Sequence, residues 1–312
     1  MTAIDATRAR SRTDDEYPLP TTLGAKPPVQ RELPEGLDQS HDLARRVQDA
    51  KNMLAAQVLA DQHALQAKAT VVERPVLIVD GISPTDVRQA ASVGDCTVEA
   101  TLASLARTPK GQAWLASRIK TERDAQGEIV GFTVLLKVRT DKGYVDQPVA
   151  VDARKFVLGH DLTKNAKGEG EVWPLVWEAA ISQQVGGHAV LGAGSDVPTS
   201  SAFITGLPAV DSVPRDDKSL GPRMLADFDA GRLQTLSTGL TVPGANPAGL
   251  APAHAYTVMD VRSNQPVLQP DGTTKLETLV YLRNPWGTND PRPMTIAEVQ
   301  RDFGAYSVGD VP

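Results

Sequence analysis

The stretch that most constrains this chain is Gly94-Asp95-Cys96, together with the helix predicted to follow it. Cys96 is the only cysteine among 312 residues, so it has no partner in the chain for a disulfide. Residues 96–107 contain neither proline nor glycine, and their apolar side chains recur at near-helical spacing, which predicts a buried helix beginning at the cysteine. A thiol in the first turn of a helix faces the positive end of the helix dipole. We therefore expect a lowered thiol pKa.

Two interpretations of Cys96 are open at this point. Most lone cysteines are small residues of a hydrophobic core. A cysteine can instead be a nucleophile, which requires an imidazole to take its proton and a third group to orient that imidazole. Downstream, His254 opens a strand-like run, and Asn284 ends another such run in the segment Asn-Pro-Trp-Gly. The three groups of a thiol protease therefore occur in the order Cys96, His254, Asn284.

Five segments, in this order along the chain, resemble the calpain-type cysteine proteases, a branch of the papain-like peptidases. They are Val79-Asp80-Gly81 through Gly94-Asp95-Cys96, Trp173-Pro174 with Glu178-Ala179-Ala180, Ala253-His254-Ala255-Tyr256, Asn284-Pro285-Trp286-Gly287, and Met294-Thr295-Ile296 with Asp302-Phe303. The resemblance covers most of the chain outside its N-terminal quarter. It implies an α+β, papain-like fold of two lobes: a helical lobe that carries Cys96 and an antiparallel β lobe that carries His254 and Asn284.

Composition and charge exclude several other classes. The formal net charge is -6, and no basic patch with interleaved aromatic residues is visible, which argues against a nucleic-acid partner. No apolar run approaches the ~20 residues that a membrane span needs, and the N-terminus lacks the apolar core of a Sec signal. A single unpaired thiol fits a reducing compartment. We expect a cytoplasmic protein, or one exported by a route that needs no such signal.

The chain divides into four expected regions. Residues 1–37 are charged and proline-containing, which is typical of a flexible leader. Residues 38–70 have apolar side chains near a 3.6-residue period and are expected to form an amphipathic helical segment. That segment either packs on the protease body or acts as a pro-region over the cleft or against a partner. Residues 71–200 are expected to form the helical lobe, and residues 201–312 the β-rich lobe.

The resemblance also implies roles for individual side chains. Cys96 attacks a peptide carbonyl, His254 is the general base and then the general acid, and Asn284 orients the imidazole. Gln89, with the backbone N–H of Cys96, holds the oxyanion. Gln89 precedes Cys96 by seven residues, one more than is usual in the family, so either the loop bulges or the oxyanion donor is displaced. Trp286 can shield the hydrogen bond between His254 and Asn284 from water.

Three further positions qualify these roles. His188, which follows a pair of glycines, is the main rival to His254 for the imidazole role. The residue after the nucleophile, Thr97, is usually tryptophan in the family. Glu99 stands where the family usually has an apolar residue, so we expect that side of the helix to be less buried. His160 lies in a polar stretch and is expected to be exposed.

The resemblance further implies one calcium site. Its expected ligands are the backbone carbonyls of Val79 and Gly81 and the carboxylates of Asp86 and Glu178. Carbonyl and carboxylate oxygens are the ligands that calcium prefers. The alternative is an ordinary aspartate-capped turn with a solvated glutamate. A second calcium site is not expected, because the segment after Asn-Pro-Trp-Gly is shortened here.

These features together predict a calpain-like cysteine endopeptidase of the calcium-dependent type, with calcium as its one expected cofactor. Its expected partner is an extended peptide or protein substrate, and a regulatory or inhibitory partner is left open. The first alternative is a catalytically silent calpain-like domain that serves as a binding scaffold. The second is acyl transfer to an amine, which the asparagine in the third catalytic position disfavours.

Overall fold

The computed structural model describes residues 69–71, 75–89, 93–153, 155–157, 170–242, 246 and 248–312. The expected leader at residues 1–37, nearly all of the expected helical segment at 38–70, and His160 lie outside these ranges. The described chain forms helices and mainly antiparallel sheets, which confirms the predicted α+β class. Within the described ranges, no helix combines the length and apolar character that crossing a membrane requires.

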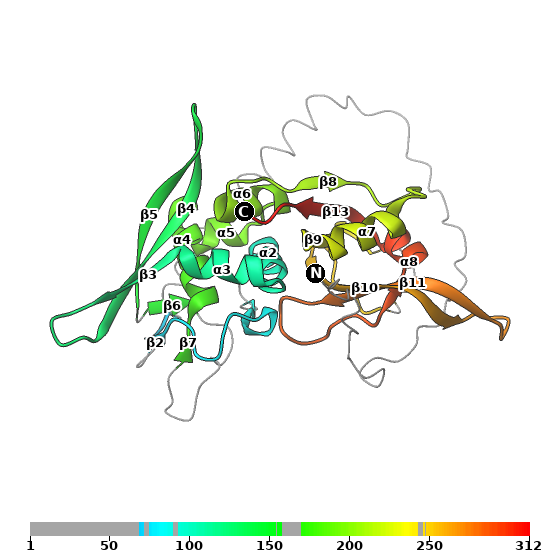
Figure 1. Cartoon of the computed structure of the whole chain (residues 1–312), viewed down its shortest axis with the longest axis horizontal. Helices are drawn as coiled ribbons and strands as arrows, with labels where there is room; N and C mark the ends of the chain where they lie inside the picture. The colour runs from blue at the N-terminus through cyan, green and yellow to red at the C-terminus, as the bar shows by residue number, and fades with distance from the viewer. Residues whose placement is uncertain are drawn as a thin grey trace, which may run out of the picture.

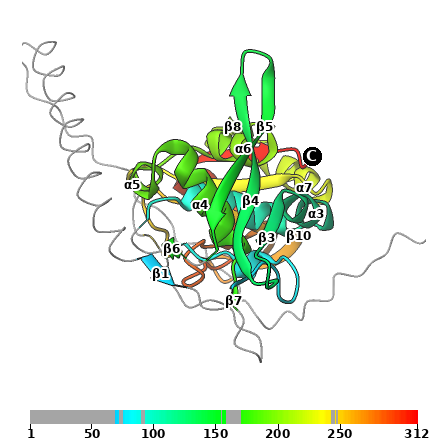
Figure 2. The ribbon, with the colours of Figure 1, turned by 90° about the vertical axis from the view of Figure 1, so that its left-hand side faces the viewer.

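The first half of the described chain is built around helices. Its elements in order are β1 (Ala69–Val71), β2 (Pro75–Val76), the 3-10 helix η2 (Pro84–Asp86), α2 (Cys96–Ala106), α3 (Pro109–Ser117), β3 (Ile119–Arg123), β4 (Ile129–Thr140), β5 (Gly143–Asp152), β6 (Lys155–Val157), β7 (Gly170–Glu171), α4 (Trp173–Val185), α5 (His188–Gly192) and α6 (Val197–Thr205). Strands β3, β4 and β5 form an antiparallel sheet, and the β4–β5 hairpin projects beyond the body (Figures 1 and 2). The tryptophans of α4, Trp173 and Trp177, are fully buried in the core beneath this sheet.

The second half is organised by one six-stranded antiparallel sheet. Its elements are β8 (Val210–Ser212), α7 (Leu220–Asp229), β9 (Leu233–Thr238), β10 (Ala255–Leu268), β11 (Thr274–Arg283), β12 (Met294–Thr295), α8 (Ile296–Asp302) and β13 (Phe303–Gly309). The strand order is β12-β11-β10-β9-β13-β8. A second hydrophobic core, formed by residues between Leu220 and Tyr306, packs against this sheet.

Helix α2 lies between the two halves (Figure 1). All eleven of its residues are buried, and Pro109, which begins α3, follows shortly after its end. Two polar side chains join α2 to the sheet: the Thr257 hydroxyl donates to the carbonyl of Ala100 at 2.9 Å, and the Ser104 hydroxyl donates to the carbonyl of Gln234 at 3.1 Å. The N–H of Gln234 donates back to Ser104 Oγ at 2.8 Å. The middle and the end of α2 are therefore held against β10 and β9, and His254 lies immediately before β10.

Candidate active site

His254 and Asn284 lie at neighbouring ends of two paired strands. His254 immediately precedes β10, and Asn284 immediately follows β11. The two strands are antiparallel, with Thr257 opposite Arg283, so the start of one lies beside the end of the other. His254 Nε2 lies 3.0 Å from Oδ1 of Asn284. The backbone N–H of His254 also donates to the Thr238 hydroxyl of β9 at 3.0 Å, which fixes this position against the sheet.

The amide of Asn284 is held in one orientation. The backbone N–H of Trp286 donates to Asn284 Oδ1 at 3.0 Å, so the carbonyl oxygen of the amide faces the imidazole. The backbone N–H of Asn284 donates to Asp290 Oδ1 at 2.8 Å, which closes the loop around the asparagine. The sequence did not point to this contact of Asp290, because an acid a few residues past a strand is common to many turns.

Two aromatic rings enclose His254. The Trp286 ring lies with its centroid 4.6 Å from that of His254, and the Tyr256 ring meets the imidazole edge-on at 4.9 Å. Only 6% of His254 is exposed. This burial lowers the pKa of His254, while its hydrogen bond with Asn284 acts in the opposite direction. The structure thus brings Trp286 to the imidazole, and it adds Tyr256, which had not been singled out.

Cys96 begins α2 and packs against Ala100 and Ala255, the residue after His254. The sulfur therefore lies beside the strand that the imidazole precedes. Burial raises the pKa of the Cys96 thiol, and the neighbouring Asp95 adds to the rise, although the backbone amides of Ala255 and Thr97 oppose it. This corrects the expectation of a lowered pKa, because desolvation of the thiolate outweighs the helix N-terminus here.

Gln89 lies in the loop before α2, and its side chain is 7% exposed. Its Nε2 donates to the carbonyl of Val93 at 2.7 Å, and its backbone N–H donates to the carbonyl of Pro285 at 2.7 Å. The backbone bond to Pro285 joins the loop before Cys96 to the Asn-Pro-Trp-Gly segment. Because Nε2 donates to Val93, the carboxamide of Gln89 is already hydrogen-bonded within its own loop. This loop is the one with an extra residue before Cys96.

A family model now adds to this geometry. Residues 54–292, more than half of the 312-residue chain, match the model described as calpain family cysteine protease. The chain belongs to the calpain family of cysteine proteases. The match spans the loop before Cys96, helix α2, and both strand ends at His254 and Asn284. Membership of the calpain family confirms the resemblance drawn from the sequence.

In this calpain-family chain, two carboxylates of the loop before α2 lie close to a third, which comes just before α4. Ligand oxygens of Asp80, Asp86 and Glu171 lie within 4.8 Å of one another. Burial and the nearby Asp86 raise the pKa of Glu171 to about 7. Glu171 Oε1 accepts from the N–H of Val79 at 3.2 Å, whereas its buried Oε2 has no hydrogen-bond partner among the described residues. An orphaned carboxylate oxygen among clustered acids fits a hard cation such as calcium.

The expected ligand Glu178 is not part of this cluster. Asp86 Oδ2 accepts from Trp173 Nε1 at 3.1 Å, so the first turn of α4 faces the loop and brings Glu171, just before the helix, next to Asp86. Glu178 is more than a turn further along α4 and groups instead with Asp95 and Glu99 of the nucleophile helix. Glu171 therefore takes the place beside Asp86 that the sequence-based assignment gave to Glu178.

Three other sequence-based expectations are resolved nearby. His188 begins α5 and contacts Glu178 at 3.3 Å, whereas His254 is the imidazole that contacts Asn284. Glu99 is 2% exposed, so the expectation of a less buried helix face is wrong. The Thr97 hydroxyl, where the family usually has tryptophan, forms a hydrogen bond with Ser195 Oγ at 2.7 Å and joins α2 to the start of α6.

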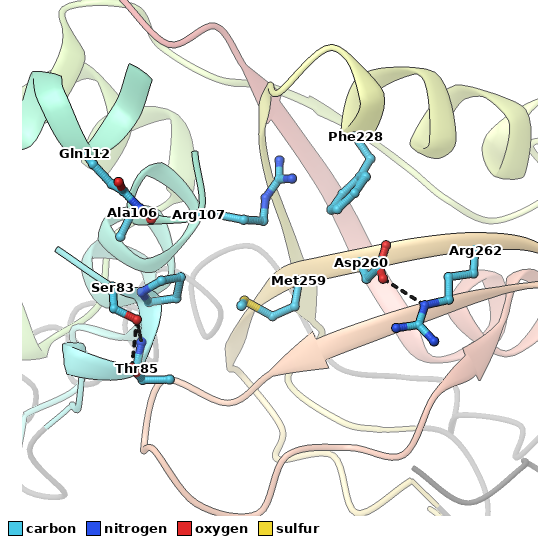
Figure 3. A pocket seen from close by; sticks show the side chains of 10 residues that line it. Ser83, Thr85, Ala106, Arg107, Gln112, Phe228, Met259, Asp260 and Arg262 are labelled. Carbon is cyan, nitrogen blue, oxygen red and sulfur yellow. Dashed lines mark hydrogen bonds and ion pairs between the residues drawn. The ribbon is translucent and has the colours of Figure 1, made fainter. Parts of the chain in front are cut away.

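A pocket of about 390 Å³ lies between the two halves, at the end of α2 opposite Cys96 (Figure 3). Its lining includes Arg107, whose guanidinium stacks over the Phe228 ring at 4.1 Å, and Met259 of β10. At a rise of about 1.5 Å per residue, the length of α2 separates this pocket from the sulfur by roughly 15 Å. It is therefore a feature separate from the candidate active site.

Proposed function

We propose that this calpain-family protein is an active cysteine endopeptidase. Cys96 supplies the nucleophile, His254 the base and acid, and Asn284 the group that orients the imidazole. The observation that carries the proposal is the buried hydrogen bond from His254 to Asn284, next to the strand against which Cys96 packs. Gln89 and the Cys96 N–H are the proposed oxyanion donors, and Trp286 covers the imidazole. We further propose two lobes, at residues 71–200 and 201–312. The first hydrophobic core also draws Ile204, Ala209, Leu233 and Val311 from the second of these ranges.

The proposed reaction is acyl transfer in two stages. Cys96 Sγ attacks the peptide carbonyl carbon as its proton passes to His254, and the carbonyl π electrons move onto the oxygen. Collapse of this tetrahedral oxyanion breaks the C–N bond, and the proton on His254 passes to the leaving amine. Water, deprotonated by His254, then attacks the thioester and releases the acid and the free thiol. Because burial raises the pKa of the Cys96 thiol, we propose that its proton passes to His254 during the attack on the carbonyl.

We also propose that one calcium ion binds at Asp80, Asp86 and Glu171, with backbone oxygens of the adjacent loop. When bound, the ion supplies positive charge that neutralises these carboxylates. The residues themselves link the loop before the nucleophile helix to α4, since Asp86 already accepts a hydrogen bond from Trp173. Calcium would therefore stabilise the loop that contains Gln89, which makes activation by calcium an expected property.

A direct test is hydrolysis of casein or of a quenched fluorogenic peptide by the full chain, with and without calcium. Replacement Cys96→Ala removes the sulfur and should abolish turnover while leaving the circular dichroism spectrum unchanged. Replacement Ser117→Ala serves as a matched control, because it also removes a single γ atom, but at the exposed end of α3. If Cys96→Ala cleaves at the wild-type rate, the proposed nucleophile is wrong.

Two observations favour a second candidate, a catalytically silent scaffold. The Gln89 amide donates to Val93 instead of projecting free toward the sulfur, and burial raises the Cys96 pKa. A scaffold of this kind would show neither turnover with calcium nor reaction of Cys96 with an electrophilic peptide. An active protease would show both.

A further inference from the structure

Arg88 is an exposed cation beside the candidate active site, and the proposed peptidase reaction does not use it. It immediately precedes Gln89, one of the two proposed oxyanion donors. The backbone N–H of Gln89 donates to the carbonyl of Pro285 at 2.7 Å, so the loop here runs alongside the Asn-Pro-Trp-Gly segment. Arg88 therefore comes from the first half of the chain but lies against the segment that contains Asn284.

The Arg88 side chain is fixed along its stem and open at its charged end. A Cβ added to Gly287 would lie 3.0 Å from Cγ and 3.2 Å from Cδ of Arg88, so the aliphatic stem packs against this glycine. Gly287 has a φ of 74°, a conformation that favours glycine, and the missing side chain leaves room for the stem. Within the described ranges no carboxylate forms an ion pair with Arg88, and the nearby Asp290 accepts from the N–H of Asn284 instead. The guanidinium is therefore available to a charge on a bound molecule.

The neighbours of Arg88 place it on the leaving-group side of a bound peptide. The Trp286 ring lies 4.6 Å from the His254 ring, centroid to centroid, and 41% of Trp286 is exposed. In the proposed reaction His254 gives its proton to the leaving amine, so the residues after the scissile bond extend across His254 and the exposed Trp286. Gly287, against which Arg88 packs, is the residue after Trp286. The exposed surface next to the leaving amine thus continues from an aromatic ring to a cation.

We infer that Arg88 and Trp286 form a substrate subsite for an acidic side chain at one of the first two positions after the scissile bond. This inference rests on the proposed peptidase function and names the substrate class of that same site. Trp286 provides a surface for the stem of an aspartate or glutamate, and the Arg88 guanidinium pairs with its carboxylate. The whole chain carries a net charge of -6, which repels acidic peptides at long range. A preference for acidic residues therefore requires a local cation.

Peptide binding to the inactive full chain tests the subsite without turnover. The Cys96→Ala chain is titrated with two pools of randomised, fluorescein-labelled peptides, and fluorescence anisotropy reports binding. The pools differ only in carrying glutamate or its neutral isostere glutamine at the two positions after the central bond. We expect the glutamate pool to bind about two- to fivefold more tightly, the range of an exposed ion pair, and adding Arg88→Gln to remove this difference. Arg215→Gln removes the same charge from an exposed residue after β8, at the far edge of the sheet, and should preserve the difference.

The sites that the active chain cuts provide a second measurement. A library of tryptic peptides is incubated with the wild type or with Arg88→Gln, and mass spectrometry identifies the residues after each cut. We expect aspartate and glutamate to be enriched at the first two positions for the wild type only. The inference is overturned if the two pools bind the Cys96→Ala chain equally, or if an acidic preference survives Arg88→Gln. Absence of any cleavage contradicts the proposed peptidase function, whereas the binding experiment still decides the subsite, so the two proposals fail separately.

Discussion

Asn284 Oδ1 lies 3.0 Å from His254 Nε2 and accepts a hydrogen bond from the N–H of Trp286 at the same distance. Because Oδ1 is an acceptor in both contacts, Nε2 carries the proton of the neutral ring. The other nitrogen, Nδ1, is then the basic one. This tautomer is the form that can accept a proton from a thiol. The loop after β11 therefore fixes the tautomer of the His254 imidazole in the absence of substrate.

The first prediction distinguishes the two histidines. Replacing His254 with alanine removes the proposed base and should lower kcat/KM by about 10²- to 10⁴-fold. Replacing His188 with glutamine should lower it far less, since His188 contacts Glu178 rather than Asn284. Both variants are assayed with the same fluorogenic peptide in saturating calcium. A larger loss in the His188 variant would show that the imidazole has been assigned to the wrong residue.

The second prediction concerns pH. Burial lowers the pKa of His254 below its usual value of 6.5. A protonated ring cannot accept the thiol proton, so activity should persist through pH 6.5 and be lost only as the pH falls through the lower, folded-state pKa. Asn284→Ala removes a hydrogen bond that raises this pKa, and should move the acid limb of kcat/KM to still lower pH. An acid limb above pH 6.5 in the wild type would contradict this environment for His254.

The third prediction concerns a close backbone contact just before Cys96. A Cβ added at Gly94 would overlap the carbonyl oxygen of Gly192, at the end of α5. Gly94→Ala should therefore displace the loop, lower the free energy of unfolding by about 1–3 kcal/mol, and reduce activity. At Gly304 the nearest atom to an added Cβ is 3.7 Å away, so Gly304→Ala is the control. Urea unfolding of both variants, followed by tryptophan fluorescence, measures the difference.

The fourth prediction concerns calcium at the first acidic cluster. A ligand present at 100 times its dissociation constant stabilises the folded state by about 2.7 kcal/mol. Calcium should therefore raise the unfolding midpoint of the Cys96→Ala chain, and Glu171→Gln should reduce this rise. Glu178→Gln should not affect binding at Asp86, contrary to the sequence-based ligand set. Calcium titrations in which Glu171→Gln matches its parent would remove Glu171 from the site.

Local patterns made most of the fold predictable. The glycine pair before His188 is a helix stop signal that sequence alone displays, and Gly186 adopts a φ of 102° as the C-cap of α4. Alternating strands around His254 and Asn284 predicted the β10–β11 pair, whose register brings the two side chains together. Sequence periodicity is sufficient to predict that His254 and Asn284 lie close together, because pairing of the two strands places the residues at their ends side by side.

The charged positions were the ones that sequence could not place. Glu171 and Glu178 both lie close to the start of α4, and the hydrogen bonds from Trp173 to Asp86 and from Val79 to Glu171 show which of them faces the loop. Glu99 is buried beside Asp95 and Glu178, and the contact with Glu178 joins distant parts of the chain, which no local pattern reports. The one extra residue between Gln89 and Cys96 likewise left the hydrogen-bond partner of the Gln89 amide, the carbonyl of Val93, open from sequence alone.

The central claim is that Cys96 is a nucleophile activated by His254, and alkylation of the thiol tests it most directly. Because Cys96 is the only cysteine, mass spectrometry after iodoacetamide treatment reports this site alone. Labelling rates are measured on the folded protein between pH 5 and 9, for the wild type and for His254→Ala. We predict a single adduct that forms markedly faster in the wild type at neutral pH. Equal rates in the two proteins, or a thiol that reacts only after unfolding, would contradict the account.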